Sequence, residues 1–282
     1  MKTRLPAVAG SFYADTDGEL RTQIHECFLH RLGPGTVPSV PAEIDESLLG
    51  LVVPHAGYEY SGPVAAHGYQ RLAVSGPRPS VIILGPNHSG YGSGVSINNT
   101  GEWSTPLGEV PVDAEMANRI VKGSGLIDVE DSAHRSEHSI EVQLPFLQFI
   151  YPRRFKFVPI CMMLQDLETS KDVGEAVAEA VQANRAIVLA SSDWTHYEPQ
   201  EKAVAKDKLA IQAAVNMDPA RFQDTIEEQR VSACGFGPVT ALIHAAKILS
   251  RNKATLLSYQ TSGDLTGDTT AVVGYAALSF TR

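Results

Sequence analysis

Short, continuous apolar runs alternate along the chain with longer stretches in which apolar residues recur every three or four positions. Continuous apolar runs that end at Gly, Pro or Asn are typical of strands covered on both faces of a sheet. The sequence therefore predicts six main strands, at residues 48–53, 81–84, 155–160, 186–190, 254–259 and 271–280.

The stretches with helical periodicity lie between these runs. They predict seven helices, at residues 17–32, 62–74, 113–121, 140–150, 167–184, 200–217 and 237–250. Strands that alternate with helices favour an α/β fold with a mainly parallel central sheet flanked by helices. The turn-rich stretch at 33–41 (GPGTVPSVP) reads as a connector, because the 32 residues before it are too few for a core of their own. We therefore expect a single α/β domain over residues 1–282.

Charge and composition narrow the classes of function. The formal net charge of the 282-residue chain is −9, which disfavours binding to the phosphates of nucleic acids. No apolar run is long enough for a signal peptide or a membrane span, so the expected location is the cytoplasm. The chain also lacks a serine-hydrolase elbow, a Walker A loop, an H-E-x-x-H motif and a C-x-x-C pair.

Histidines follow three of the predicted strands within a few residues. His55 comes after the first strand, His88 after the second, and His196 after the strand at 186–190. Ligands of open α/β sheets bind at the carboxyl ends of the strands, where such side chains meet. A single loop histidine is more often structural, but His55 and His88 at equivalent strand ends favour a metal site.

The third ligand predicted is Cys234, in the segment SACGFGP before a helix. A helix N-terminus stabilises a thiolate, and two imidazoles with one thiolate make a three-ligand site with an open position. The alternative is that Cys234 is a small apolar residue at a helix start. Cys27 and Cys161 lie in apolar patterns and are expected in the core.

Further candidates surround these three residues. Asp193 and His196 lie three positions apart in a loop, where the carboxylate could orient a general base, although a capping Asp beside a surface His explains the spacing equally well. Glu137 and His138 precede a helix, and we expect them to support the ligands. Tyr58 belongs to an aromatic loop that could line a pocket over the site.

Seven ordered motifs in this sequence resemble those of the Memo family, known in bacteria and archaea as protein B of the AmmeMemoRadiSam gene group. They are AGSFY, PHAGYEYSG, LGPNHSG, WSTPLGEVPVD, EHSIEVQLPFLQ, SSDWTHY and CGFGP. The resemblance covers nearly the whole chain. Two small departures, at Ala14 and Thr195, touch none of the proposed ligands.

The resemblance implies a fold like that of the class III extradiol dioxygenases, in which two histidines and a carboxylate bind non-haem iron. By motif, His55 and His88 match the two histidines, Cys234 takes the place of the carboxylate, and His196 matches the catalytic base. A thiolate is a softer ligand and is itself oxidisable, so the fold analogy favours iron or copper without transferring the reaction.

Three functions fit these observations. The first is a metal-dependent oxidoreductase with iron or copper, and the second is a non-catalytic module that binds a peptide or small molecule in the same crevice. The third is a zinc hydrolase, since a His/His/Cys site can activate water. The family resemblance also implies a functional link to a radical SAM protein and an AMMECR-type protein.

Overall fold

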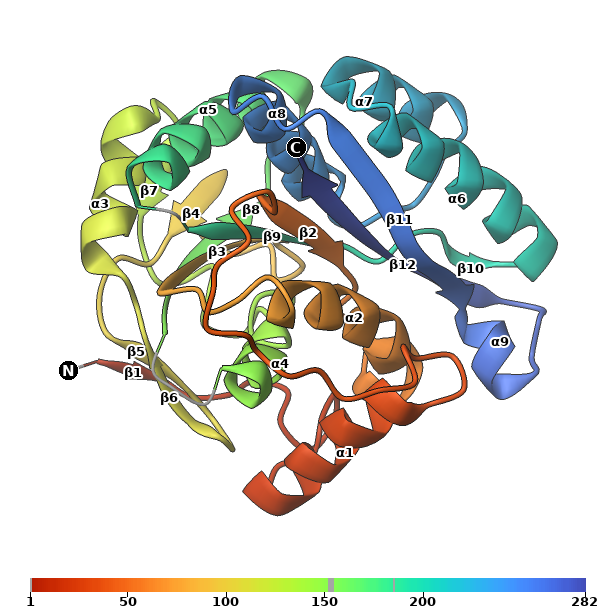
Figure 1. Cartoon of the computed structure of the whole chain (residues 1–282). Helices are drawn as coiled ribbons and strands as arrows, with labels where there is room; N and C mark the ends of the chain where they lie inside the picture. Colours follow the sequence, from red (N-terminus) through yellow and green to blue (C-terminus); the bar gives the residue numbers. More distant parts are fainter. Residues whose placement is uncertain (1, 152–154, 185) are drawn as a thin grey trace.

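The structure of the protein is a computed structural model that describes residues 2–151, 155–184 and 186–282. Within these residues a nine-stranded sheet forms the centre of the molecule, with β11 paired to β12 beside the order β10-β12-β2-β9-β3-β8-β4-β7. Four neighbouring strands run parallel to one another at its middle (Figure 1). They are β2 (Gly50–Val53), β9 (Ile187–Ser191), β3 (Ser80–Pro86) and β8 (Lys156–Met162).

The parallel strands pair over apolar residues. Leu51 lies opposite Leu189, and Ile82 lies opposite both Val188 and Val158. Every residue of β2, β3 and β9 is buried. Burial on both faces explains why these segments read as continuous apolar runs and not as an alternating pattern.

Antiparallel strands complete the sheet on both sides. On one side β12 (Val272–Thr281) runs antiparallel to β2, to β11 (Lys253–Thr261) and to β10 (His196–Glu198). On the other, β4 (Val95–Ile97) is antiparallel to β8 and parallel to β7 (Ile127–Val129). The α/β fold is thus confirmed as a mixed sheet flanked by helices, with the parallel pairing concentrated in its middle.

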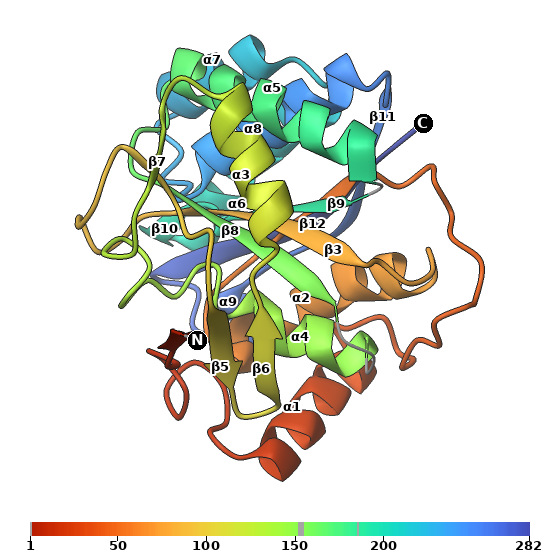
Figure 2. The same cartoon turned by 90° about the vertical axis from the view of Figure 1, so that its left-hand side faces the viewer.

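Helices cover both faces of the sheet, and each face has its own apolar core (Figures 1 and 2). One face is covered by α3 (Ala114–Gly123), α5 (Leu167–Asn184), α6 (Gln200–Val215), α7 (Pro219–Glu228) and α8 (Phe236–Ile248). The other is covered by α1 (Asp17–Leu29), α2 (Tyr58–Ala73) and α4 (Gln143–Ile150). A short helix, α9 (Ser262–Thr266), joins β11 to β12.

The predicted strands and helices are all present, with shifted ends. The largest shift is at α2, which begins at Tyr58 and not at residue 62, so the expected aromatic loop is the first turn of a helix. Gly57 is its N-cap, and the Ser61 hydroxyl donates to the Ala56 carbonyl. Pro63 lies inside this helix, near its N-terminal end.

The N-terminal segment belongs to a second, small sheet. In it β1 (Thr3–Arg4) is parallel to β5 (Glu102–Thr105), which is antiparallel to β6 (Gly108–Pro111). This sheet lies below the central sheet, on the same side as α1 and α4 (Figure 2). The start of the chain is thereby fixed beside residues about 100 positions further along the sequence.

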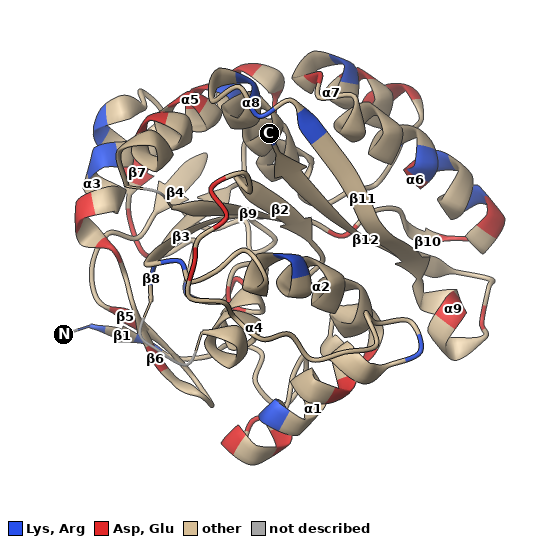
Figure 3. Cartoon of the chain, viewed as in Figure 1, with Lys and Arg blue, Asp and Glu red and all other residues tan. Residues whose placement is uncertain are grey.

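Charged side chains lie mainly on the helices and loops, and both signs are interspersed (Figure 3). The central strands carry almost none of them. Among the described residues, no helix combines the length and the apolar composition that crossing a bilayer requires.

Candidate metal centre

The predicted site residues converge at the carboxyl ends of the parallel strands. His55 follows β2, His88 follows β3 and Asp193 follows β9, and these strands are neighbours in the order β2-β9-β3. Parallel strands end at one edge of the sheet, so their following loops meet there. The strand-end argument from the sequence therefore describes how these three residues come together.

His55 is held in place through both its backbone and its ring. Its backbone N–H donates to Asp193 Oδ1 at 2.8 Å, and its Nδ1 lies 2.8 Å from Ser191 Oγ. The side chain is 1% exposed. Burial, together with the neighbouring His138 and His88, holds the pKa of His55 well below its ordinary value, so the ring is a neutral imidazole, the form that binds metals.

His88 is oriented by a buried carboxylate. Glu137 accepts hydrogen bonds from the backbone N–H of His88 and, at 2.9 Å, from its Nδ1. Burial alone would raise the pKa of Glu137, but the hydrogen bond and charge of His88, the Ser139 N–H and the charge of His138 together outweigh burial and hold that pKa well below its usual range. A carboxylate on the far nitrogen of a ligand histidine is the usual support of a metal site, which leaves Nε2 of His88 for an ion.

His138 lies closer to the other histidines than the supporting role expected from the sequence. His55, His88 and His138 each present a ring nitrogen, and these three nitrogens lie within 4.8 Å of one another. The His138 ring stacks on that of His88, with centroids 4.7 Å apart and planes 24° apart. The three side chains form a group that could hold a metal ion.

Cys234 lies beside this group, two residues before α8 begins. Its Sγ is 3.2 Å from Nε2 of His55 and accepts a hydrogen bond from the Asp193 backbone N–H at 3.2 Å. Gly235 permits this close approach, because a Cβ there would lie 2.2 Å from the Ser191 carbonyl oxygen. Burial, and then the charge of Asp193, raise the pKa of Cys234, and a bound cation would reverse this preference in favour of the thiolate.

His196 stands at the start of β10, with its ring fixed by Ser232. Its Nδ1 lies 2.9 Å from the Ser232 carbonyl oxygen, and its backbone N–H donates to Ser232 Oγ at 2.7 Å. Since a carbonyl only accepts, Nδ1 carries the proton and Nε2 has the free lone pair of a general base.

Asp193 orients His55 and not His196, which differs from the pairing expected from the sequence. Among the described residues the hydrogen-bond partner of the His196 ring is Ser232, whereas Asp193 binds the backbone of His55. Burial raises the pKa of Asp193 to about 6.

Tyr58 also differs from expectation, because it belongs to the core and not to the lining of a pocket. The side chain is 2% exposed, its hydroxyl donates to the Val142 carbonyl at 2.6 Å, and its ring packs on Phe146. The exposed tyrosine of this turn is Tyr60.

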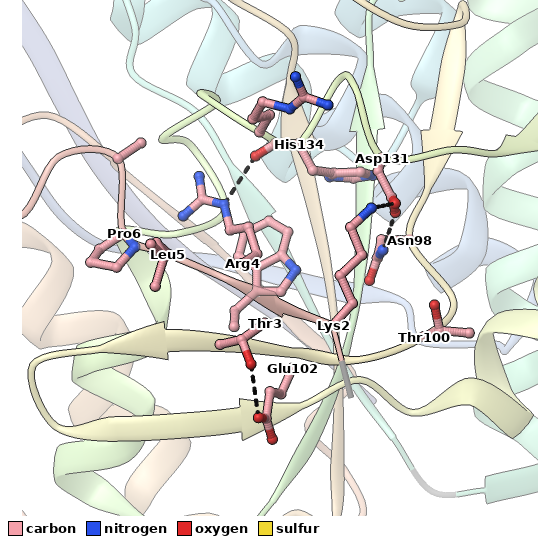
Figure 4. A pocket seen from close by; sticks show the side chains of 13 residues that line it. Lys2, Thr3, Arg4, Leu5, Pro6, Asn98, Thr100, Glu102, Asp131 and His134 are labelled. Atoms are coloured by element: carbon pink, nitrogen blue, oxygen red, sulfur yellow. Dashed lines mark hydrogen bonds and ion pairs between the residues drawn. The ribbon is translucent and has the colours of Figure 1, made fainter.

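Arg4 was not among the residues predicted for the site, yet it anchors the segment that carries Glu137 and His138. Its Nε donates to the His134 carbonyl and its Nη2 to the Glu137 carbonyl, at 3.0 and 2.7 Å, and its Nη1 pairs with the buried carboxylate of Glu141. Figure 4 shows Arg4 and its bond to His134 in the cavity beside β1. One side chain thus holds three points of this segment.

The donor set fits a transition-metal ion. Neutral imidazoles and a cysteine sulfur are ligands of iron, copper and zinc, and not of magnesium or calcium. His55 and His88 are each held at Nδ1 by a buried group, as ligand histidines are. Burial keeps bulk water from His55, whereas His88 is exposed and Cys234 is partly exposed.

Fold and site together define an α/β protein with a histidine-rich centre at the carboxyl edge of its sheet. The chain belongs to the Memo family, whose model, described as Memo-like protein, matches residues 4–279. It is 48% identical over 281 residues to a MEMO1 family protein of Methanopyrus kandleri, with 99% of each chain covered. A MEMO1 family protein of Sulfurisphaera tokodaii is 46% identical, with 98% of this chain and 99% of the relative covered.

A solved structure supports the fold independently. The crystal structure of an uncharacterized protein from Escherichia coli K12 superposes with a TM-score of 0.58 at 13% identity. The match covers 82% of this chain and 99% of the other. At this identity the likeness is one of fold.

Proposed function

We propose that the protein binds a redox-active metal ion, iron or copper, through His55, His88 and Cys234, and serves as a metal-dependent oxidoreductase. The observation that carries the proposal is the convergence of three histidine rings within 4.8 Å, with the Cys234 sulfur 3.2 Å from one of them. When bound, such an ion would supply one-electron chemistry and activation of a small ligand at an open position.

The sequence motifs and the geometry favour different residues as the third protein ligand. Motif correspondence favours Cys234, while the spacing of ring nitrogens favours His138. We propose Cys234 as the ligand and His138 as the side chain that limits the space beside the ion, since His138 stacks flat on His88 and shares the Glu137 carboxylate with it.

His196 is the proposed acid–base residue. With Nδ1 held by the Ser232 carbonyl, its Nε2 is free to accept a proton from a substrate and return it later. Its side chain is only half-buried, so a substrate can reach it. Asp193 supports the reaction indirectly, because it fixes the backbone of His55.

The deciding experiment is metal analysis of protein purified without a histidine tag. We expect near-stoichiometric iron or copper in the wild type, a sharp loss in Cys234→Ala, and a milder loss in His138→Gln. Cys161→Ala is the matched control, because this thiol is also buried but hydrogen-bonds to the Pro86 carbonyl and to none of the described histidines, so the variant should retain the metal.

Metal-free protein that takes up no added iron, copper or zinc would overturn the proposal. A loss in His138→Gln as large as that in Cys234→Ala would make His138 a ligand. Stoichiometric zinc, with hydrolysis of esters or amides, would move the assignment to a zinc hydrolase.

A second function, ligand binding without catalysis, is favoured by exposed tyrosines beside the site. Tyr60 and Tyr197 are 39% and 78% exposed, and the Tyr197 ring lies next to that of His196, with centroids 5.9 Å apart. Aromatic rings at an entrance suit a peptide or a small organic ligand. Binding of such a ligand that is unchanged in His55→Ala and in the metal-free protein would favour this module over the oxidoreductase.

A further inference from the structure

His55 is connected to a buried chain of polar side chains that the metal-site motifs do not explain. The chain runs from Tyr69 through Gln143 and Ser191 to Nδ1 of His55. All four residues are at most 1% exposed. Buried polar groups without water must satisfy one another, so the direction of each hydrogen bond can be worked out.

The direction is fixed first at Gln143. Its Nε2 lies 3.0 Å from the Pro54 carbonyl oxygen and 2.8 Å from Ser191 Oγ, and its Oε1 accepts from the Tyr69 hydroxyl at 2.6 Å. A carbonyl only accepts, so the amide nitrogen must face Pro54. Both of its hydrogens are then used, one on Pro54 and one on Ser191.

Ser191 is fixed next. Its Oγ lies 2.7 Å from the carbonyl oxygen of Ser139, which again only accepts. The single hydroxyl hydrogen of Ser191 therefore points to Ser139, because leaving that buried carbonyl unpaired would cost about 1–3 kcal/mol. Ser191 has no hydrogen left for His55, and its oxygen can only accept from the ring.

We infer that Ser191 is a positioning residue that fixes His55 in the Nδ1–H tautomer, and that Gln143 holds Ser191 and the Pro54 carbonyl in place for it. The proton on Nδ1 leaves the lone pair on Nε2, the atom that faces the Cys234 sulfur 3.2 Å away. The inference deepens the proposed function, since this is the atom that would bind the metal. It also gives a role to Gln143 in the motif EHSIEVQLPFLQ.

The first test needs no metal. In metal-free protein labelled with ¹⁵N on its histidines, two-bond ¹H–¹⁵N correlation spectra identify the protonated ring nitrogen. We expect wild-type His55, assigned by its absence in His55→Gln, to carry its proton on Nδ1 alone. Ser191→Ala removes the acceptor, so His55 should lose this single tautomer. Gln143→Met should keep it, because the Ser139 carbonyl still takes the Ser191 hydrogen.

The second test is metal affinity by competition with a chelator. Supporting hydrogen bonds of ligand histidines contribute roughly 10- to 100-fold in affinity, so we expect a loss of that size in Ser191→Ala and a smaller one in Gln143→Met. Ser75→Ala is the matched control: Ser75 is also fully buried and also donates to a carbonyl, but that carbonyl belongs to Leu72 at the end of α2. Thermal unfolding of each variant separates a general loss of folding from a local one.

The two tests separate this inference from the function beneath it. A wild-type His55 protonated on Nε2 would overturn the inference whether or not metal binds. So would a Ser191→Ala variant with the wild-type tautomer and affinity. If no variant and no wild type binds metal, the proposed function fails, while the tautomer spectra still decide the role of Ser191.

Discussion

Side chains that hydrogen-bond to the histidines are expected to affect metal affinity at the candidate centre strongly, as the ligands themselves do. Glu137 is the clearest example, because one buried carboxylate accepts hydrogen bonds from the ring and backbone of His88 and from the backbone N–H groups of His138 and Ser139. Two histidines of the site thus depend on a single residue. These contacts give both residues of the Glu137-His138 pair a place in the candidate site.

Glu137→Gln should therefore weaken metal binding without removing a ligand. The amide keeps the shape of the side chain but has only one acceptor oxygen, so the contact with His88 Nδ1 or with the backbone is lost. We expect affinity to fall roughly 10- to 100-fold, measured by chelator competition. Glu109→Gln, an exposed carboxylate on β6, is the control and should bind as the wild type does.

His134 makes stability depend on pH. Burial lowers its pKa to about 4, and no described residue hydrogen-bonds to either ring nitrogen. In the unfolded chain a histidine titrates near 6.5. Between these values the unfolded state binds the proton and the folded state does not, so stability falls as the pH drops from about 6.5 to about 4 and levels off below.

His134→Phe should remove that dependence. The contribution of one such histidine over this pH range is about 3 kcal/mol. We therefore expect the unfolding free energy of the variant, measured in urea, to gain about this much relative to the wild type between pH 7.5 and pH 4. Parallel pH curves for the two proteins would contradict the assignment of a buried neutral His134.

The N-terminal strand is the secondary-structure element whose role was least visible in the sequence. β1 has two residues, yet Arg4 from this strand fixes both the backbone around Glu137 and the carboxylate of Glu141. Its guanidinium also lies over the Trp103 ring, 4.4 Å from the centroid. The strand β1 thus supports the segment that carries two residues of the candidate metal centre, Glu137 and His138.

Arg4→Met should test this connection. Removing one partner of a buried ion pair costs about 3–5 kcal/mol, and the freed segment should also bind metal less tightly. Lys2→Met is the control, because the Lys2–Asp131 pair beside it is exposed and worth at most about 1 kcal/mol. Unfolding curves and metal affinity are compared for both variants; equal, small effects would show that β1 does not support the site.

The strands most easily predicted from sequence are those buried on both faces. Strands β2, β3 and β9 are buried at every position, so their apolar runs stand out. The three-residue strands β4, β7 and β10 were missed, because their pairing depends on neighbours far along the chain. The helix α7 was also not predicted. It is separate from α6, because Asp218 is its N-cap and Pro219 its first residue.

At the level of the whole molecule, the sequence predicted the class of fold and the edge of the sheet where the site lies. It could not predict the order of strands, which places β9 between β2 and β3, nor the antiparallel partners at the sides. For the same reason it could not show that Ser232 and not Asp193 binds the ring of His196. Those contacts follow from packing between distant segments.

Because the site joins several segments of the fold, metal binding should stabilise the entire protein. A ligand that binds only the folded state at 100 times its Kd adds about 2.7 kcal/mol, which for a chain of this size corresponds to roughly 5–10 °C in Tm. We expect a shift of this order on adding the native ion to chelator-treated protein. The same addition should leave the Tm of Cys234→Ala nearly unchanged.

Under the proposed ligand set, the 179 residues between His55 and Cys234 also determine when a newly made molecule can take up an ion. A ribosome adds about 5–20 residues per second, so roughly 10–35 seconds separate the emergence of these two side chains. During that interval the growing chain has histidines but no complete centre. With these ligands, metal loading would be a late event in synthesis, and a chain that stops before residue 234 would lack the proposed thiolate ligand.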